Sequence, residues 1–223
     1  MNIVVVGSNG RLGSQIVKDL KEEKNKVYEV DLSGLIKGID LITPKAIDGI
    51  IDVSCATNSI KTAEFAKKHH IPLAIGCTGH NEEELKEIEK ASKQTSILLC
   101  YNFAFGVNAL KLALKSLLKY SPKSAYTLEI HHKNKKDAPS GTAKDLEKII
   151  NKFDVNLYPT VSIRESSIVG KHSIDLYWDD EHITITHEAI TRNCFSSGAI
   201  KALKLLVTAK NGLYSLDDLI NNS

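Results

Sequence analysis

The chain has 223 residues, of which 42% are hydrophobic and 25% charged, and its formal net charge at pH 7 is +2. This length suits two small domains, and the nearly balanced, interspersed charges argue against a nucleic-acid or membrane-surface partner. No apolar run of about 18 residues occurs, and the N-terminus lacks a basic leader. The four cysteines have neither CxxC nor disulfide-framework spacing, so we expect a cytoplasmic protein without a metal.

The chain begins with a pattern typical of a strand, a glycine turn and an amphipathic helix. Residues 3–6 are β-branched or apolar, and glycines then recur at Gly-x-x-Gly-x-x-Gly spacing from Gly7 to Gly13. About twenty residues later, the apolar stretch 27–32 contains Asp31. A glycine turn at a helix N-terminus can hold a pyrophosphate, and an acid after the second strand can bind a ribose diol. We therefore predict dinucleotide binding, with a tight turn that binds nothing as the alternative.

Strand and helix signals alternate over the next seventy residues. Strands are predicted at 47–54, 72–77 and 96–101, with a helix at 59–70 and a second helix opened by an Asn81–Glu84 capping box. This alternation predicts a parallel sheet, whose ligands bind beyond the carboxyl ends of the strands. Those ends are 54–57, 76–79 and 100–103, expected around one crevice. Three cysteines fall there, and an oxidation-sensitive pocket is a minor hypothesis.

The pattern changes after residue 106. We predict a helix from Val107 to about Tyr120, and further helices at 142–153 and 197–210. Strands are expected at 125–130, 160–168, 172–178 and 182–188, with turns at 169–170 and 179–180 and a short closing turn at 213–220. The predicted fold is α/β, with a Rossmann-like parallel-sheet domain and a smaller α+β domain with a mixed sheet. The first domain spans 1–103 and is completed by 195–223, and the second spans 104–194.

The segment EIHHKNKKDAPSGT, residues 129–142, is too polar for a core. His131 and His132 are neighbours at a strand end and should face opposite ways. Lys135 follows closely, and Pro139-Ser140-Gly141 turns the chain into a helix whose N–H groups, with the Thr142 hydroxyl, suit an anion. Together these groups favour a small polyanionic substrate that needs a proton. The alternatives are structural histidines, solvated lysines at Lys133 and Lys136, and a simple helix cap.

Several motifs resemble the dihydrodipicolinate (4-hydroxy-tetrahydrodipicolinate) reductase family over nearly the whole chain. HHKNKKDAPSGTA is similar to the family signature HHxxKxDAPSGTA, and VVVGSNGRLG to its glycine turn. AIGCTG and CYNFAFGVN resemble its next two motifs, and IVGKH, ITITHEAITR, FSSGAIKAL and GLYSLDDLI follow in the family's order.

The resemblance implies hydride transfer from NADH or NADPH to a cyclic dicarboxylate imine in the lysine and diaminopimelate pathway, by a homotetramer. It implies that His131 and Lys135 exchange the proton and that His132, Gly141 and Thr142 hold substrate carboxylate. It also implies that the cofactor is bound by Gly7, Ser8, Asn9, Gly10, Arg11, Leu12, Asp31, Gly76, Cys77, Thr78, Cys100, Tyr101, Asn102 and Phe103.

The chain departs from the family pattern at several points. Cys77 replaces a threonine, the turn at 54–57 lacks a proline, and Leu32 stands where an arginine could meet a 2′-phosphate, so we expect NADH to serve at least as well as NADPH. The segments 36–47 and 153–163 are shorter than usual. A nucleotide-sensing module without turnover and a reductase of another small cyclic dicarboxylate remain as alternatives.

Overall fold

The structure is a computed structural model that describes residues 1–31, 46–165 and 167–221. The chain divides into two units, Met1–Ala104 with Phe195–Ser223, and Phe105–Cys194. No helix among the described residues is both long and apolar enough to cross a membrane.

The first unit is built on a six-stranded parallel sheet. Its strands are ordered β11-β5-β4-β3-β1-β2, and all of their pairings are parallel. The four inner strands are short and almost wholly buried, as expected when both faces are covered by helices. The six strands are β1 (Asn2–Val6), β2 (Lys26–Val30), β3 (Gly49–Asp52), β4 (Leu73–Ile75), β5 (Ser96–Leu99) and β11 (Gly212–Tyr214).

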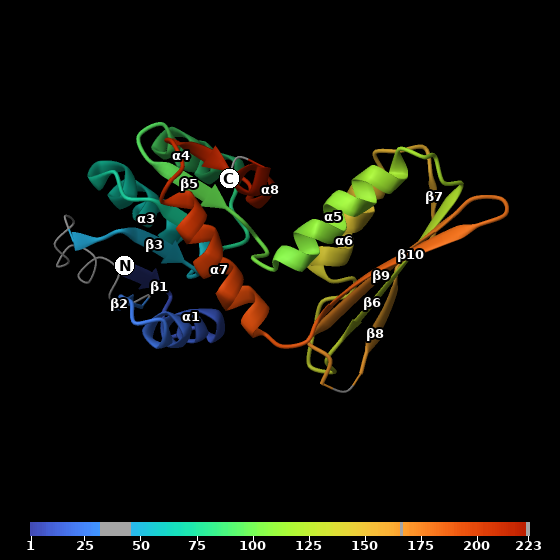
Figure 1. Ribbon diagram of the computed structural model, residues 1–223, viewed down its shortest axis with the longest axis horizontal. Coiled ribbons are helices and arrows are strands. Elements are labelled where there is room, and N and C mark those ends of the chain that lie inside the picture. Colours follow the sequence, from blue (N-terminus) through green and yellow to red (C-terminus); the bar gives the residue numbers. More distant parts are fainter. Residues whose placement is uncertain (32–45, 166, 222–223) are drawn as a thin grey trace. The chain divides into compact units, whose positions relative to one another are not determined.

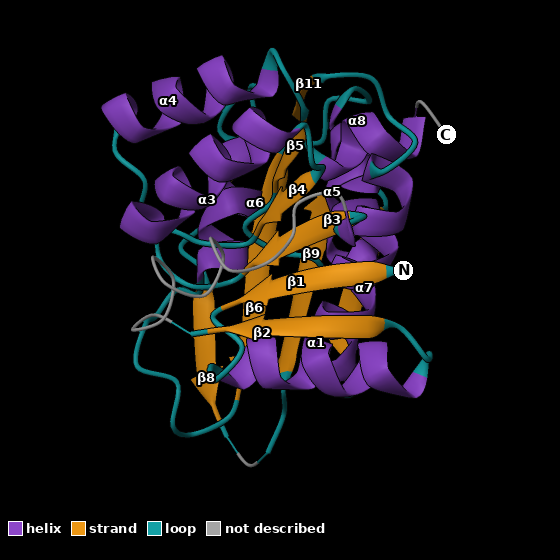
Figure 2. Ribbon diagram, turned by 90° about the vertical axis from the view of Figure 1, so that its left-hand side faces the viewer, coloured by secondary structure: helices purple, strands orange, loops and turns teal. Residues whose placement is uncertain are grey.

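Helices cover both faces of this sheet, with α3 and α4 on one face and α1 and α7 on the other (Figure 2). Helix α7 packs so closely on β3 that a side chain at Gly49 would lie 2.9 Å from Leu203 Cδ1. The predicted capping box of α4 is confirmed, because Asn81 and Glu84 each accept a hydrogen bond from the other's backbone N–H. The helices are α1 (Arg11–Glu22), α3 (Ala56–His69), α4 (Glu82–Ser92), α7 (Asn193–Leu206) and α8 (Leu216–Asn221).

The second unit has a mixed sheet with two helices on one face (Figure 1). Strand β6 is antiparallel to β9 and parallel to β7 and β8, while β9 pairs with β10. The predicted fold class, a Rossmann-like parallel sheet plus a smaller mixed-sheet domain, is therefore confirmed. The elements are α5 (Phe105–Leu118), β6 (Ser124–His131), α6 (Gly141–Ile150), β7 (Asn156–Leu157), β8 (Val161–Arg164), β9 (Gly170–Tyr177) and β10 (His182–Ala189).

Several predicted element boundaries are wrong. The closing turn at 213–220 is instead β11 followed by α8, because Gly212 and its neighbours pair with β5. Helix α3 begins three residues earlier than predicted, and α7 is shifted by four residues toward the N-terminus. The strand predicted at 160–168 ends at Arg164, Gly170 of the predicted turn is already the first residue of β9, and β7 was not predicted. A strand of two or three residues is too short to show alternation, so only its pairing reveals it.

Strand β6 places alternate side chains on opposite faces of the mixed sheet. Ala125, Thr127, Glu129 and His131 are buried on the helix-covered face. Tyr126 lies on the other face, stacked on Tyr158 at 4.4 Å between ring centroids. The two-residue period of a strand thus places Glu129 on the same face as His131.

Candidate active site

The glycine turn of the first unit follows β1 and leads into α1. Gly7 has φ +82°, a conformation that favours glycine, and its N–H donates to Val30 O at 2.8 Å. A Cβ at Gly13 would lie 2.0 Å from Gly7 O, so only a glycine lets the helix approach the turn this closely. Ser8 is buried, while Asn9, Gly10 and the first helical residue, Arg11, are exposed. Since the first turn of a helix leaves N–H groups unpaired, the predicted phosphate-binding residues surround an anion-compatible helix end.

Asp31 follows β2, beside the glycine turn. Asn9 Nδ2 donates to Asp31 Oδ2 at 3.1 Å, so the residue in place of a central glycine orients the acid expected to bind a ribose. Leu12 is half-buried on α1. Leu32, on which the prediction of NADH use partly depends, lies outside the described residues, as does most of the shortened segment 36–47.

The ends of β3, β4 and β5 lie close together in the first unit, as predicted for a parallel sheet. A Cβ at Gly76 would lie 2.5 Å from Phe103 Cε2 and 3.1 Å from Val53 Cγ1. Cys77, Cys100 and Phe103 are buried, Asn102 is half-buried, and Thr78 and Tyr101 are exposed. The structure therefore brings the two predicted nicotinamide-side motifs into contact.

Asp52, which the sequence analysis did not single out, ends β3 and is 0% exposed. Its Oδ1 accepts hydrogen bonds from the Ser54 N–H at 2.9 Å and from Cys77 Sγ at 3.4 Å. Burial raises the pKa of Asp52, and the hydrogen bonds from its neighbours offset only part of that effect. Burial and the nearby Asp52 carboxyl also raise the pKa of the Cys77 thiol. A protonated, buried thiol is unreactive, which argues against oxidation at Cys77.

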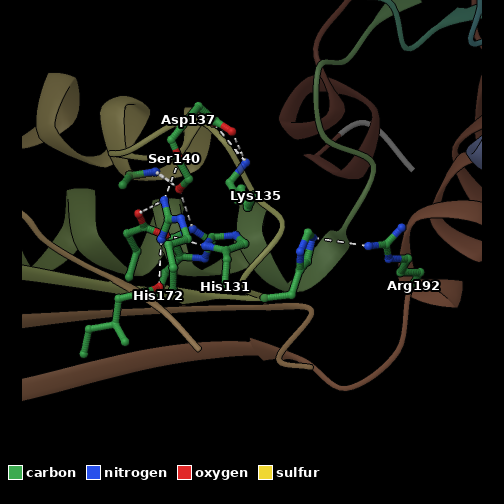
Figure 3. Close-up of polar contacts among 11 residues, drawn as sticks. His131, Lys135, Asp137, Ser140, His172 and Arg192 are labelled. Atoms are coloured by element: carbon green, nitrogen blue, oxygen red, sulfur yellow. Dashed lines mark hydrogen bonds and ion pairs between the residues drawn. The ribbon is translucent and has the colours of Figure 1, made fainter. Parts of the chain in front are cut away.

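The second candidate cluster lies at the end of β6 (Figure 3). His131 is 8% exposed, and its Nδ1 hydrogen-bonds Glu129 Oε2. His132, by contrast, is half-buried, with its Nε2 3.3 Å from the Arg192 guanidinium. The two neighbouring histidines therefore have different partners, as the alternation of a strand predicts.

Lys135 lies in the loop that follows β6, where its ammonium contacts both Asp137 carboxylate oxygens at 2.7 and 2.9 Å. The hydrogen bond from Lys135 holds the pKa of Asp137 below its ordinary value. Lys133 and Lys136 are exposed, as expected for solvated side chains. Only Lys135 of the three is partly sheltered, so it alone lies in the cluster.

The N-terminus of α6 completes the cluster. Ser140 is the N-cap, and its hydroxyl accepts a hydrogen bond from the Ala143 N–H at 3.2 Å. A Cβ built on Gly141 would meet no atom within 4 Å among the described residues. Gly141, the first residue of α6, therefore borders open space at a helix end that favours an anion.

His172 on β9 was not predicted as a site residue. It lies opposite Glu129 in the sheet, and its Nε2 is 3.0 Å from the Ser140 hydroxyl. Its ring is edge-on to His131, with centroids 5.1 Å apart. Burial and the charge of His131 lower the pKa of His172 to about 4. The ring is therefore neutral at physiological pH.

The electrostatics of His131 and Glu129 are coupled. Burial acts to raise the pKa of Glu129, but hydrogen bonds from Arg164 and His131 outweigh it and hold the pKa below its ordinary value. Burial lowers the pKa of His131, and Glu129 offsets only part of that effect. Glu129 is thus an ionised group beside a histidine that burial biases toward its neutral form.

Glu129, His131 and His172 each offer an atom within 4.8 Å of the others, a spacing compatible with metal ligands. However, an Arg164 nitrogen lies 2.6 Å from the same Glu129 carboxylate. A cation at this position would be repelled by the guanidinium and would have to displace the hydrogen bond between His131 and Glu129. These contacts favour a proton-handling cluster over a metal centre.

Five residues of this cluster were missed in the sequence. The sequence contained a local signal for Glu129 alone. It occupies a position of β6 that alternation predicts to be buried, and a buried glutamate needs a partner. The others are brought in by pairings distant in the sequence or by the loop geometry. The missed residues are Glu129, Asp137, Arg164, His172 and Arg192.

Comparisons with known proteins identify a family that matches both units. The family model "Dihydrodipicolinate reductase, N-terminus" matches residues 1–103, and the model "Dihydrodipicolinate reductase, C-terminus" matches 106–220. A 4-hydroxy-tetrahydrodipicolinate reductase of Pelagibacter ubique is 35% identical, covering 99% of this chain and 98% of its own. The enzyme of that name from Nitratiruptor sp. is 32% identical, covering 98% of each.

Solved structures show the same fold. A dipicolinate-bound dihydrodipicolinate reductase from Paenisporosarcina sp. TG-14 aligns with a TM-score of 0.75 at 18% identity, covering 96% of this chain and 97% of its own. A myo-inositol dehydrogenase from Corynebacterium glutamicum aligns with a TM-score of 0.60 at 12% identity, covering 99% and 92%.

Proposed function

The chain belongs to the dihydrodipicolinate reductase family, and from this premise we propose the reaction and the residues that perform it. The enzyme reduces 4-hydroxy-tetrahydrodipicolinate to tetrahydrodipicolinate with a nicotinamide cofactor, in diaminopimelate and lysine biosynthesis. The observation that carries the proposal is the cluster of His131, His132 and Lys135 beside the open N-terminus of α6. The related structure bound to dipicolinate supports a small dicarboxylate substrate.

The first unit fits a nicotinamide dinucleotide. The tight approach of Gly13 to Gly7 O brings the N-terminus of α1 against the turn, and the N–H groups of the first turn of that helix would bind a pyrophosphate. The nicotinamide half would lie along Gly76, Cys77 and Thr78 and along the segment from Cys100 to Phe103. When bound, the cofactor supplies the hydride.

Asp31 favours NADH over NADPH in this proposal. Its carboxylate, held by Asn9, can accept hydrogen bonds from the two hydroxyls of an adenosine ribose, whereas it would repel a 2′-phosphate. Arg11 is exposed at the start of α1, and its guanidinium could contact a 2′-phosphate. The ratio of kcat/KM for the two cofactors, in wild type and in Asp31→Ser, measures this preference.

The second unit holds the substrate and supplies the proton. The N-terminus of α6 at Gly141 and Thr142, together with His132, would bind a carboxylate. Carboxylates bound there would favour the protonated imidazole of His131, opposing the burial that lowers its pKa. His131 would then give its proton to the reduced substrate while the Lys135 ammonium, positioned by Asp137, acts as the partner donor.

The uncovered face of the mixed sheet suits a homotetramer. Tyr126, Tyr158 and Tyr177 gather there at 37–42% exposure, and Tyr177 stacks on His182 at 5.0 Å between ring centroids. Aromatic side chains are enriched where subunits meet. Sedimentation of wild type and of Tyr126→Asp tests the assembly, and monomeric wild type would overturn it. We also propose a cytoplasmic location, in keeping with the free cysteines.

A coupled assay tests the reaction. The synthase that precedes this step supplies the unstable substrate, and NADH or NADPH absorbance is followed. We expect oxidation of a cofactor that depends on the synthase. No oxidation of either cofactor would overturn the proposed reaction, and cofactor binding without turnover would indicate a nucleotide-binding module instead.

Three variants test the roles within the second unit. His131→Gln and Lys135→Ala should each lower kcat by about 10²-fold or more, the usual cost of losing a positioned acid or base. Lys133→Ala is the matched control, because it removes the same charge from an exposed position in the same loop. Wild-type turnover in both His131→Gln and Lys135→Ala would reassign the proton donors.

A further inference from the structure

Glu129 and Arg164 have no role in the mechanism above, yet Glu129 is buried beside His131 and Arg164 is half-buried next to it. Glu129 is 0% exposed and lies two residues before His131 on the same face of β6. Arg164 on β8 is in register with His131. A buried carboxylate is costly unless it is paired and hydrogen-bonded. The partners of Glu129 therefore indicate what its charge does.

Both oxygens of Glu129 are occupied, each by a different partner. Oε1 accepts a hydrogen bond from an Arg164 nitrogen at 2.6 Å, and Oε2 accepts one from His131 Nδ1. The same Arg164 nitrogen donates to the Asp137 carbonyl at 2.6 Å. Asp137 in turn holds the Lys135 ammonium. One guanidinium therefore contacts both the carboxylate behind His131 and the loop that carries Lys135.

The Glu129 contact decides which His131 nitrogen can exchange a proton. An ionised carboxylate can only accept hydrogen bonds, so the nitrogen facing it, Nδ1, must carry a hydrogen. Neutral His131 then has its lone pair on Nε2, and a second proton can be gained or lost only there. Among the described residues, Nε2 has no hydrogen-bond partner, and a Cβ at Gly170 would lie 2.9 Å from it. A glycine at this position keeps the space beside the reactive nitrogen free.

We propose that Glu129 and Arg164 are a positioning pair for the proton-transfer residues: Glu129 fixes the Nδ1–H form of His131, and Arg164 holds both Glu129 and the Lys135 loop. This inference rests on the proposed function, in which His131 and Lys135 handle the proton. Neither residue of the pair is expected to touch the substrate. Both act through the geometry and charge of their partners, as an orienting carboxylate does behind a general base.

A purely structural role for Glu129 does not predict a change in the pKa of His131, whereas a charge that acts on His131 does. The charged and titratable groups that face His131 are Glu129, Arg164 and Lys135, together with the His172 ring. Of these, Glu129 raises the pKa of His131, whereas the positive charges of Lys135 and Arg164 lower it. Glu129→Gln keeps an oxygen that can accept from Nδ1–H but removes the negative charge. The pH at which His131 loses its proton must then move downward.

The first measurement does not depend on activity. Nitrogen-15 NMR of the histidine side chains, assigned with His131→Gln, reports the tautomer and the titration of His131 in the full-length protein. We expect a hydrogen on Nδ1 and a lower pKa in Glu129→Gln than in wild type. A hydrogen on Nε2, or an unchanged pKa in the variant, would overturn the proposal even if the enzyme is active.

Kinetics then test coupling through His131. Glu129→Gln should lower kcat by roughly 10- to 100-fold with little change in KM, by analogy with the cost of losing a carboxylate that orients a metal-bound histidine. Added to His131→Gln, it should cause little further loss, because a residue that acts through another has no effect once that partner is gone. Multiplicative losses in the double variant would overturn the proposal.

Two controls separate positioning from folding. Glu188→Gln makes the same chemical change in an exposed ion pair with Lys171 on the same sheet, and it should leave kcat and the pH profile unchanged. Fluorescence of Trp178, the single tryptophan, reports whether the second unit of Glu129→Gln is folded. If wild type itself shows no turnover, the proposed function fails, whereas the NMR result still decides the positioning pair.

Discussion

Asp52 in the first unit and Glu129 in the second are both fully buried carboxyls, yet their pKa values move in opposite directions. Each is 0% exposed on a strand of a central sheet. The pKa of Asp52 is raised by burial, whereas that of Glu129 is lowered because its hydrogen-bond partners outweigh burial. Burial alone therefore does not determine whether an acid carries a charge in this protein.

The difference lies in the neighbours. Asp52 is surrounded by neutral donors, chiefly Ser54 and the Cys77 thiol, which cannot compensate a buried negative charge. Glu129 has the Arg164 guanidinium at 2.6 Å. Asp52 therefore connects the ends of β3 and β4 through hydrogen bonds from uncharged groups, whereas Glu129 has a cation that stabilises its charge beside His131.

Removing the Arg164 cation that pairs with Glu129 should have the largest effect on the free energy of unfolding. Arg164→Met would leave a buried carboxylate without its counter-charge, a change that typically costs about 3–5 kcal/mol. Urea denaturation followed by Trp178 fluorescence measures the free energy of unfolding of the second unit. Arg164→Lys, which keeps the charge, is the control and should lose less. A loss below about 1 kcal/mol in Arg164→Met would mean that the ion pair contributes little.

His172 is a third buried titratable group, a base whose hydrogen-bond partner is the Ser140 hydroxyl and not a carboxylate. Its folded pKa is about 4, against about 6.5 in an unfolded chain, so the unfolded state binds the proton first as pH falls. Stability is present above about pH 6.5 and declines by about 1.4 kcal/mol per pH unit down to about pH 4, about 3 kcal/mol in all. His172→Gln should flatten that decline in denaturation curves, whereas exposed His182→Gln should not. An equally steep decline in both variants would show that other groups cause it.

Asp52→Asn should change the free energy of unfolding only slightly, in contrast to changes at the Glu129 ion pair. If the folded protein holds Asp52 as a neutral acid, a neutral amide of the same shape changes the free energy of unfolding at pH 7 by about 1 kcal/mol or less. Denaturation of Asp52→Asn and Glu129→Gln under identical conditions measures the difference. A larger loss in Asp52→Asn would show that the Asp52 charge stabilises the fold.

Cys77 should give the smallest effect of all. Its thiol is 4% exposed, and burial with the nearby Asp52 carboxyl raises its pKa, so the reactive thiolate is suppressed. We expect mild peroxide to change cofactor affinity less than about twofold in both wild type and Cys77→Ser. Mass spectrometry should find oxidation first at exposed Cys55. Loss of affinity in wild type that Cys77→Ser prevents would restore the oxidation-sensitive pocket.

Sequence patterns predicted the fold class because the signals are local. The alternation of strand and helix signals indicated the parallel sheet, and the capping box at Asn81 was confirmed because it spans only four residues. The segment 129–142 also contained its own evidence: the strand parity that separates His131 from His132 and the turn into α6 are properties of adjacent residues.

Only the tertiary structure supplied the partners of those residues. Arg164 reaches Glu129 across 35 positions, and Arg192 reaches His132 across 60. Such contacts depend on which strands become neighbours and in what register, and the same is true of β11, which is a strand only because it pairs with β5. The sequence by itself thus determined which chemical groups are present and on which face of an element they lie. Sheet order decided which of them meet, because hydrogen bonds and charges act over a few ångströms in space, regardless of separation along the chain.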